Sequence, residues 1–461
     1  MGTLSSALNI AVQAMLANET ALDTTSNNIA NANTPGYSRQ TVNFVEAPPV
    51  EYGGQLYGTG VQVSQIVSQR SGVLQLLLNN DTQQQAQYSS YLTTMQQVQT
   101  LFNETSGNGL QSSITGFFNS LQQLSEDPSN TTDRQAVLTA AENMAQNFNS
   151  ISANLTSLQQ NADTSVTQSV NQINALTPQI AQLNSQISEA VSTGQNAGSL
   201  MDQRDQLINQ LSGLIGVSEI DAGNGNVTVT TTAGAPLVVD NKSFQLTTQP
   251  DPATGFQHIY SLGNDITSTI SGGALGGAIQ VRDSTIPSIQ SSLDSLASSL
   301  ENSFNSINQA GFDLNGNPGG NFFVPPPAGG VGAAAEMSVA ITDPSQIAAS
   351  QDGSAGDNSN VNAMLAVQNQ AIVNGQTPIN AYSSLVFQIG NDVSSTQSEQ
   401  QGSQASIQQV QNQIGSISGV SINEEAANLI QYQQAYQAAA QAAAVISSLT
   451  QTAITMFSSS H

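Results

Sequence analysis

The two ends of the chain decide its fold, because each carries a long apolar heptad. Residues 422–457 read INEEAANLIQYQQAYQAAAQAAAVISSLTQTAITMF, in which one row of positions recurs with alternating spacings of three and four. Residues 4–29 read LSSALNIAVQAMLANETALDTTSNNI and carry a row with the same seven-residue period. Such patterns predict two amphipathic helices, each of which needs a partner to cover its apolar stripe.

The positions of the two rows indicate how the helices begin and pack. The C-terminal row consists of Leu429, Tyr432, Tyr436, Ala439, Ala443, Ile446, Thr450, Ala453 and Phe457, and the N-terminal row of Leu8, Met15, Leu22 and Ile29 with Leu4, Ala11, Asn18 and Thr25 four residues before each. Ser421 and Glu424 predict a capping box, with Glu425 in the first turn. We expect the two ends to form a coiled-coil pair that can pack against further copies, although the closing pair of a globular bundle would give the same pattern.

Composition excludes several partners and sites. The chain has 461 residues, enough for two to four domains, and no cysteine, so neither disulfides nor thiolate metal sites can form. A net charge of −25 disfavours nucleic acid and anionic membranes as partners. Charged residues make up only 8%, against about 25% in a typical soluble protein. One hypothesis is that the protein works outside the cell in an acidic medium, where ion pairs contribute little.

The location of the protein is not indicated by an ordinary targeting signal. Residues 1–4 lack the basic and apolar regions of a secretory signal peptide, and no stretch approaches the length of a membrane span. A chain without a signal peptide or a membrane span is normally expected to stay in the cytoplasm. The absence of cysteine and the uncharged polar surface instead suit an exterior location reached by a route that reads no cleaved signal.

Between the terminal heptads, helical segments flank one β-rich insertion. Residues 31–38 predict a loop, residues 41–70 short strands or an extended arm, and residues 72–105 and 110–124 helices. A long helix is predicted after Pro128, with a Thr132/Gln135 capping box and a kink or break at Pro178. A period of two begins near residue 217, helical spacing returns at Ile279, and residues 313–360 are rich in Gly and Pro.

This order predicts a mainly α fold with an inserted β-rich domain. The predicted terminal coiled-coil domain comprises residues 1–60 and 416–461, and the helical rod domain comprises 61–212 and 279–415, with 313–360 irregular. The predicted outer β-rich domain comprises 213–278. The chain is thus predicted to extend along the rod, form the β-rich domain and return along the rod.

Several motifs resemble those of the bacterial flagellar axial proteins, the rod, hook and hook-associated proteins. The run SNNIANANTPGYSR at 26–39 resembles the N-terminal signature of the family, and its continuation YSRQ is most similar to the hook-associated members. Further similar motifs are DQRDQL at 202–207, NQAGFD at 308–313 with Phe322-Phe323, DPSQIA at 343–348, and EEAANLI at 424–430 with YQQAY at 432–436. They lie in order along nearly the whole chain, which makes their combination specific.

The resemblance implies a non-catalytic structural subunit at the junction of hook and filament, on which the filament is built. It implies export through the flagellar type III apparatus without a cleaved signal and an extracellular location in the flagellum. The implied partners are further copies in a ring polymer, the hook protein, the next junction protein and a cytoplasmic export chaperone on the C-terminal helix. In such proteins the paired terminal helices form the inner tube, which would place Leu8, Met15, Leu22 and Ile29 against Leu429, Tyr436 and Ile446.

The loop that contains Thr34, Pro35, Gly36, Tyr37 and Arg39 has two interpretations. Arg39 is one of only six cations in the chain, so a contact with a neighbouring subunit's carboxylate is one hypothesis. A tight turn after a helix, set by Pro35 and Gly36, is the other. We therefore include this loop with Tyr432, Phe457 and the heptad residues among the predicted subunit contacts.

No motif predicts catalysis, a cofactor or a metal. His258 and His461 have no ligand spacing, and a His-Glu-x-x-His motif is absent. Asp313, Asn315 and Asn317 match the start of a calcium loop, but Pro318 and Val324 stand where Gly and Glu are needed. The glycine run 272–277 does not match a dinucleotide fingerprint and is predicted to be a hinge. A rod or hook subunit, and less plausibly a flagellum-associated hydrolase with paired carboxylates, are the alternative functions.

Overall fold

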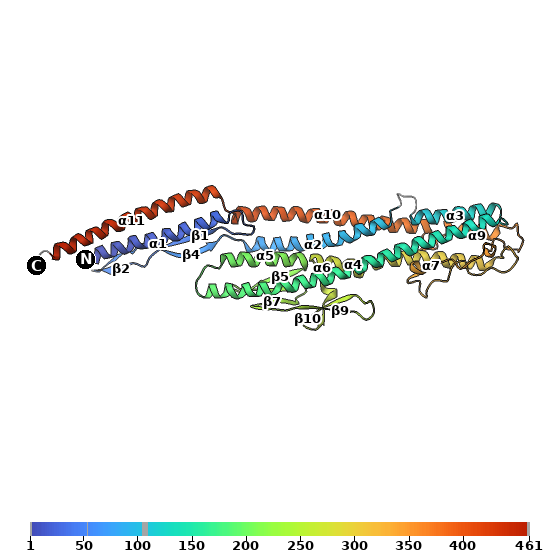
Figure 1. Cartoon of the computed structure of the whole chain (residues 1–461), viewed down its shortest axis with the longest axis horizontal. Helices are drawn as coiled ribbons and strands as arrows, with labels where there is room; N and C mark the ends of the chain where they lie inside the picture. The colour runs from blue at the N-terminus through green and yellow to red at the C-terminus, as the bar shows by residue number, and fades with distance from the viewer. Residues whose placement is uncertain (1, 53, 104–108, 459–461) are drawn as a thin grey trace.

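The protein is an elongated, mainly helical molecule with a β-rich region inserted between helices (Figure 1). The computed structural model describes residues 2–52, 54–103 and 109–458. The N- and C-terminal helices lie side by side at one end, and helices α2, α4 and α10 run along the length of the molecule toward the other end (Figure 1). The predicted fold class is therefore confirmed, whereas the predicted domain boundaries stay a prediction.

Most helices agree with the predicted helical segments, but the short helix at 333–336 lies in the region that was predicted to be irregular. They are α1 (Gly2–Ala30), α2 (Gly72–Leu101), α3 (Leu110–Glu126), α4 (Thr131–Ser192), α5 (Gly198–Leu214), α6 (Gly273–Gln280), α7 (Ile286–Ala310), α8 (Ala333–Glu336), α9 (Ser359–Ala366), α10 (Pro378–Ser418) and α11 (Ile422–Ser458). A π-helical turn, Val281–Thr285, joins α6 to α7. At about 1.5 Å per residue, the 62 residues of α4 make it the longest strut of the molecule.

The longest helix corrects two details of the sequence analysis. It begins one residue after Asn130, whose side chain accepts hydrogen bonds from the backbone N–H groups of Thr132 and Asp133. Asn130 is therefore the N-cap, and the predicted Thr132/Gln135 capping box is wrong, because both residues lie inside the helix. Pro178 also lies inside α4, which continues through it to Ser192, so the predicted break is wrong. Packing along the whole helix outweighs the local cost of the proline.

The strands form an arm near the N-terminus and two small sheets in the middle of the chain. In the arm, β1 (Gln40–Glu46) pairs antiparallel with β4 (Val61–Ser68), and β2 (Val50–Tyr52) with β3 (Gln55–Tyr57). The central sheets contain β5 (Val217–Asp221), β6 (Val227–Thr231), β7 (Pro236–Val239) and β8 (Lys242–Ser243) in that order, and β9 (Leu246–Pro250), β10 (Gln257–Ser261) and β11 (Asn264–Asp265). Burial of Val227, Val229 and Thr231 confirms the predicted period of two.

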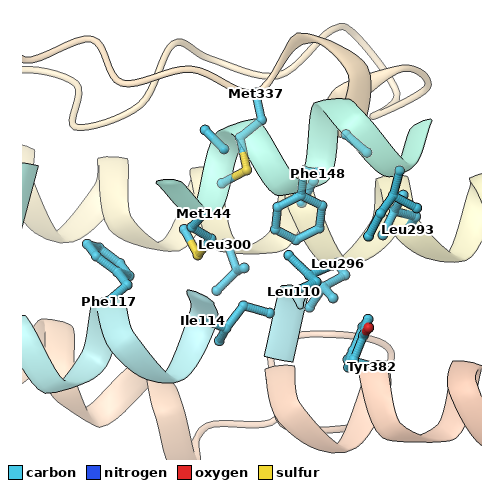
Figure 2. Packing of buried hydrophobic residues seen from close by; sticks show 14 of the residues in the cluster. Leu110, Ile114, Phe117, Met144, Phe148, Leu293, Leu296, Leu300, Met337 and Tyr382 are labelled. Atoms are coloured by element: carbon cyan, nitrogen blue, oxygen red, sulfur yellow. The ribbon is translucent and has the colours of Figure 1, made fainter. Parts of the chain in front are cut away.

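The main hydrophobic core lies at the end of the rod opposite the terminal helices. Phe117, Phe118, Phe304, Phe322 and Phe323 are buried there, and the ring centroids of Phe117 and Phe304 are 5.0 Å apart. Phe117 lies close to Met144 and Leu300, which come from α4 and α7 (Figure 2). A second core joins α4, α5 and α6 to the β sheets. Neither of these two cores includes residues of the terminal pair.

The glycine run 272–277, predicted to be a hinge, forms the N-cap and the first five residues of α6. Gly273 begins α6, and Gly277 lies so close to α2 that an added Cβ would be 2.4 Å from the carbonyl oxygen of Gln87. The glycines therefore allow two helix backbones to approach closely. The run stands where the chain returns from the β sheets, as predicted, but it forms a packed helix crossing.

All five arginines are held by contacts within the chain. Arg39 and Arg70 form ion pairs with Glu424 and Asp205, and Arg282 pairs with Asp163 and Asp283. The other two donate to uncharged oxygens: Arg134 to backbone carbonyls that include Ile347, and Arg204 to Asn184 and Gly225. Lys242 on β8 is exposed. The surface is thus strongly acidic, with little exposed positive charge.

Candidate assembly interface

The terminal helices α1 and α11 pack against each other, as the two heptads predict (Figure 1). In α11 the half-buried positions include the predicted row from Leu429 to Ala453. In α1, Ala11 and Thr25 are buried, while Leu8, Met15, Leu22 and Ile29 are half-buried. The side chain of Phe457 lies outside the described part of the structure. The pair therefore covers only part of its apolar surface within one chain.

A second row on α11 is left exposed. It consists of Ala438, Ala442, Val445, Leu449, Thr452 and Met456, which again follow alternating spacings of four and three. Val445, Leu449 and Met456 are 58%, 52% and 68% exposed. This row lies one residue behind the row that faces α1, so α11 presents two adjacent stripes. A helix with two such stripes can pack against two partners at once.

The strand arm adds apolar surface beside the terminal pair. It lies along α1 (Figure 1), and the ring of Phe44 on β1 lies 6.2 Å from the ring of Tyr432 on α11. Farther out, Val50 and Leu56 are 58% and 71% exposed. Monomeric proteins rarely leave contiguous apolar surface of this kind uncovered. The arm and α11 together therefore form the principal candidate surface for contact with other subunits.

The loop after α1 docks on α5 rather than projecting from the molecule. Gly36 has a φ of +76°, and a Cβ there would lie 2.0 Å from the side-chain nitrogen of Gln206 on α5. The same nitrogen donates a hydrogen bond to the carbonyl oxygen of Pro35. The positive φ favours glycine at this position, and the absence of a Cβ leaves room for the side chain of Gln206.

Ser38 and Asp202 form the most buried contact between this loop and α5. The backbone N–H and the hydroxyl of Ser38 donate to the two carboxylate oxygens of Asp202 at 2.9 and 2.8 Å. Burial raises the pKa of Asp202, and the two hydrogen bonds from Ser38 oppose that shift. Burial and the nearby carboxylates of Asp202 and Glu425 raise the pKa of Tyr37 to about 12. Tyr37 is therefore a neutral hydrogen-bond donor at physiological pH.

Arg39 contacts the start of the C-terminal helix in the same chain. Its guanidinium lies 2.9 Å from the carboxylate of Glu424, and its backbone N–H donates to the carbonyl of Ser418 at the end of α10. The hydroxyl of Ser421 accepts from the backbone N–H of Glu424 at 3.4 Å, which is one half of the predicted capping box. A contact of Arg39 with a neighbouring subunit stays a prediction. The loop is more than a tight turn, since it meets three helices.

The sequence analysis did not single out Asn28, Ser38, Asp202 or Gln206 as site residues. All four lie inside the two motifs at 26–39 and 202–207, which are far apart in the chain. Contact between the two motifs could have been predicted only by matching the polar residues of one motif with those of the other as hydrogen-bond partners. Heptad periodicity gives no information on such contacts.

The described residues hold few groups suited to chemistry. His258 and Asp265 lie 2.7 Å apart beside an open hollow of about 480 Å³ between the β sheets and helices α2 and α6. Asp313 accepts hydrogen bonds from the backbone N–H groups of Asn315 and Asn317, so its carboxylate closes a polar turn. Within residues 2–52, 54–103 and 109–458, no group of three or more His, Cys, Asp or Glu side chains could hold a metal ion.

No helix in the described part of the chain combines the length and hydropathy needed to cross a membrane.

Comparison with known families divides the chain into three matching parts. Residues 95–323 match the flagellar hook-associated protein FlgK helical domain. Residues 8–37 match the flagella basal body rod protein family, and residues 412–456 match the flagellar basal body rod FlgEFG protein C-terminal family. The two end matches cover most of α1 and of the loop after it, and nearly all of α11.

Individual relatives match the chain over almost its full length. Flagellar hook-associated protein 1 of Bacillus subtilis is 30% identical over 94% of this chain and 94% of its own, and that of Escherichia coli is 29% identical over 95% and 97%. The solved structure of the flagellar hook junction protein FlgK from Burkholderia pseudomallei superposes with a TM-score of 0.67 at 21% identity, over 74% of this chain and all of that one. This chain therefore belongs to the flagellar hook-associated protein 1 family.

Proposed function

We propose that the protein is a non-enzymatic structural subunit of the bacterial flagellum. In this proposal it forms the ring that joins the hook to the filament and serves as the template on which the filament is built. The uncovered second row of α11 carries the proposal, because a helix that is already paired with α1 still exposes Val445, Leu449 and Met456. Such a stripe needs a further partner in the working protein.

The occupant that fits this stripe is a second copy of the chain. The row is repeated at heptad spacing, is bordered by alanines and carries no charge, so a neighbouring helix of the same kind can approach closely. Contacts between different surfaces on successive copies produce rings or helical arrays rather than closed dimers. The exposed arm residues Val50 and Leu56 offer further apolar surface for such contacts.

The position of such a ring between hook and filament implies further binding partners. The hook protein would lie on one side and the next junction protein on the other, outside the cell. Export through the flagellar type III apparatus, without a cleaved signal, would carry the chain there. Before assembly, a cytoplasmic chaperone on α11 would cover the exposed row and prevent premature association.

Electron microscopy of a strain that lacks the gene, with an assay of flagellin in the medium, tests the proposal. Complete hooks without filaments, together with free flagellin, are the expected result. Missing hooks would instead assign the protein to the rod or hook, and normal filaments would reject a flagellar role. A peptidoglycan-release assay on the purified protein tests the hydrolase alternative, and we expect no release above a buffer control.

A further inference from the structure

Asn28, in the last turn of α1, uses its whole side-chain amide in hydrogen bonds to two other segments. It is 1% exposed. Its oxygen accepts from the backbone N–H of Gln40 at 3.0 Å and from the hydroxyl of Tyr37 at 2.8 Å. Its nitrogen donates to the carbonyl of Gln40 at 2.8 Å and to the carboxylate of Glu425 at 3.0 Å. A primary amide has two donor hydrogens and two acceptor positions, so every one of them is occupied.

The contact with Glu425 makes this arrangement depend on the C-terminal helix. Glu425 is 3% exposed and lies in the first turn of α11, almost 400 positions after Asn28 in the chain. If α11 were not paired with α1, one amide hydrogen of Asn28 would lose its acceptor. The orientation of that amide is what holds both backbone groups of Gln40. The pairing of the chain ends is therefore linked to the conformation of the loop.

The same loop is anchored to the rod on its other side. Ser38 donates twice to Asp202, the side chain of Asn196 donates to that of Gln40 at 2.8 Å, and the backbone N–H of Arg39 donates to Ser418. Asn196 lies two residues before α5, which carries Asp202, and Ser418 ends α10, so these contacts belong to the rod. Residues 34–40 thus lie between the terminal pair and the rod and contact both.

We infer that Asn28 is a positioning residue that couples the pairing of α1 with α11 to the docking of residues 34–40 on α5. The terminal pair and the rod are then held at one angle only after the two chain ends have met. An exported chain would thereby acquire its rigid shape in the same step in which its ends pair. This inference concerns contacts within one chain and goes beyond the proposed role in the flagellum.

Asn28→Asp is the sharpest test, because it preserves the shape of the side chain. The change removes both donors and places a second carboxylate beside Glu425 in a buried site. Asn27→Asp is the matched control, because it adds the same charge one residue away at an exposed position, where the oxygen of Asn27 accepts from Asn31. Glu425→Gln in the Asn28→Asp background restores a donor and removes the repulsion.

The readout is the distance between spin labels on either side of the joint. The chain has no cysteine, so Gln411→Cys on α10 and Gln437→Cys on α11 label two exposed positions uniquely. The labels lie on the order of 40 Å apart if the two helices are roughly in line at about 1.5 Å per residue. Double electron–electron resonance on the monomer then reports the angle, and circular dichroism reports helix content.

We expect a narrow distance distribution for the parent and for Asn27→Asp, a broad one for Asn28→Asp, and a narrow one again for Asn28→Asp with Glu425→Gln. A narrow distribution for Asn28→Asp overturns the inference, as does broadening that Glu425→Gln does not reverse. Should Asn28→Asp lower the helix content, Ser38→Ala decides the matter. It leaves the contacts between α1 and α11 in place and removes one hydrogen bond to Asp202, so unchanged width there also overturns the inference.

Discussion

The guanidinium of Arg282 lies 2.6 Å from the carboxylate of Asp163 and joins the π-helical turn to the middle of α4. Arg282 is fully buried, donates also to Asp283 and to the carbonyl of Gln257, and lies 5.6 Å from the centre of the Phe256 ring. Asp163 in turn accepts from the backbone N–H of Gln257. One ion pair therefore fixes β10 and the return helix to the rod.

Replacing Asp163 by alanine should be strongly destabilising. The change removes one of the two carboxylates that pair with the buried guanidinium, and the loss of a partner of a buried group typically costs about 1–3 kcal/mol of unfolding free energy. Denaturant unfolding measures the loss, and hydrogen exchange should show it first in β9 and β10. Glu189→Gln removes an exposed carboxylate from the same helix and should change stability by less than about 0.5 kcal/mol. Equal effects of the two variants would contradict this account.

Glu301 should make the protein less stable in alkaline solution. It is 1% exposed on α7, and burial, with the nearby carboxylates of Asp294 and Glu336, raises its pKa from 4.5 to about 8. Because the folded pKa is the higher one, the stability that protonated Glu301 contributes is complete below about pH 4.5 and is lost as the pH rises through about 8.

The variant Glu301→Gln keeps the neutral form at every pH. We expect it to match the parent near pH 4.5 and to melt at a higher temperature at pH 9, by an amount that corresponds to several kcal/mol. Glu336→Gln removes only a neighbouring charge at an exposed position and should give a smaller gain. Melting curves from pH 4.5 to 9 decide the question. Parallel curves for parent and Glu301→Gln would show that the carboxyl is not buried in solution.

Charges on the second row of α11 should prevent self-association without unfolding the monomer. Val445→Asp with Leu449→Asp places two carboxylates where a neighbouring helix is expected to pack, and each should weaken association by at least about tenfold. Ser447→Asp is the control, because two residues turn about 200° around the helix and place the charge on the opposite side from Val445. Sedimentation velocity measures association. Equal association of both variants would exclude this row as a contact surface.

Salt should strengthen the association of subunits rather than weaken it. Each chain has a net charge of −25, and its five arginines are already used in contacts within the chain. Apart from the exposed Lys242, contacts between copies should therefore rest on apolar and uncharged polar groups, while like charges repel. Raising the salt from about 0.01 to 1 M shortens the screening length from about 30 to 3 Å. Sedimentation at the two salt concentrations tests this, and weaker association at high salt would indicate ion pairs between subunits.

Periodicity allowed the helical parts of the fold to be predicted well. The row from Leu429 to Ala453 is the half-buried face of α11, and the alternation from Val227 to Thr231 is a strand. An apolar repeat shows which face of a helix or strand is buried, but it does not show which segment covers that face. For that reason it did not show that Ala17, Ala21 and Asn28 would be the most buried side chains of α1 along with Ala11 and Thr25.

Contacts between polar residues far apart in the chain could not be predicted in the same way. The ion pair of Arg39 with Glu424 of the same chain was not predicted, and the expected contact of Arg39 with a neighbouring subunit stays a prediction. Nothing local distinguishes Asp202 from the nearby Asp205, yet one binds the loop and the other pairs with Arg70. The N-cap of a helix is the residue whose side chain reaches the free N–H groups of the first turn. In α4 this residue is Asn130 and not the predicted Thr132.

The placement of the arginines also determines how the folded chain meets a digestive protease. Trypsin-like enzymes must enclose an extended lysine or arginine side chain, and in this chain no arginine side chain is more than 23% exposed. Lys242, next to the turn between β7 and β8, is the exposed target that remains. A subunit that works outside the cell would thus be open to trypsin mainly at Lys242, because of the position of a few cations rather than because of a disulfide or a covering layer.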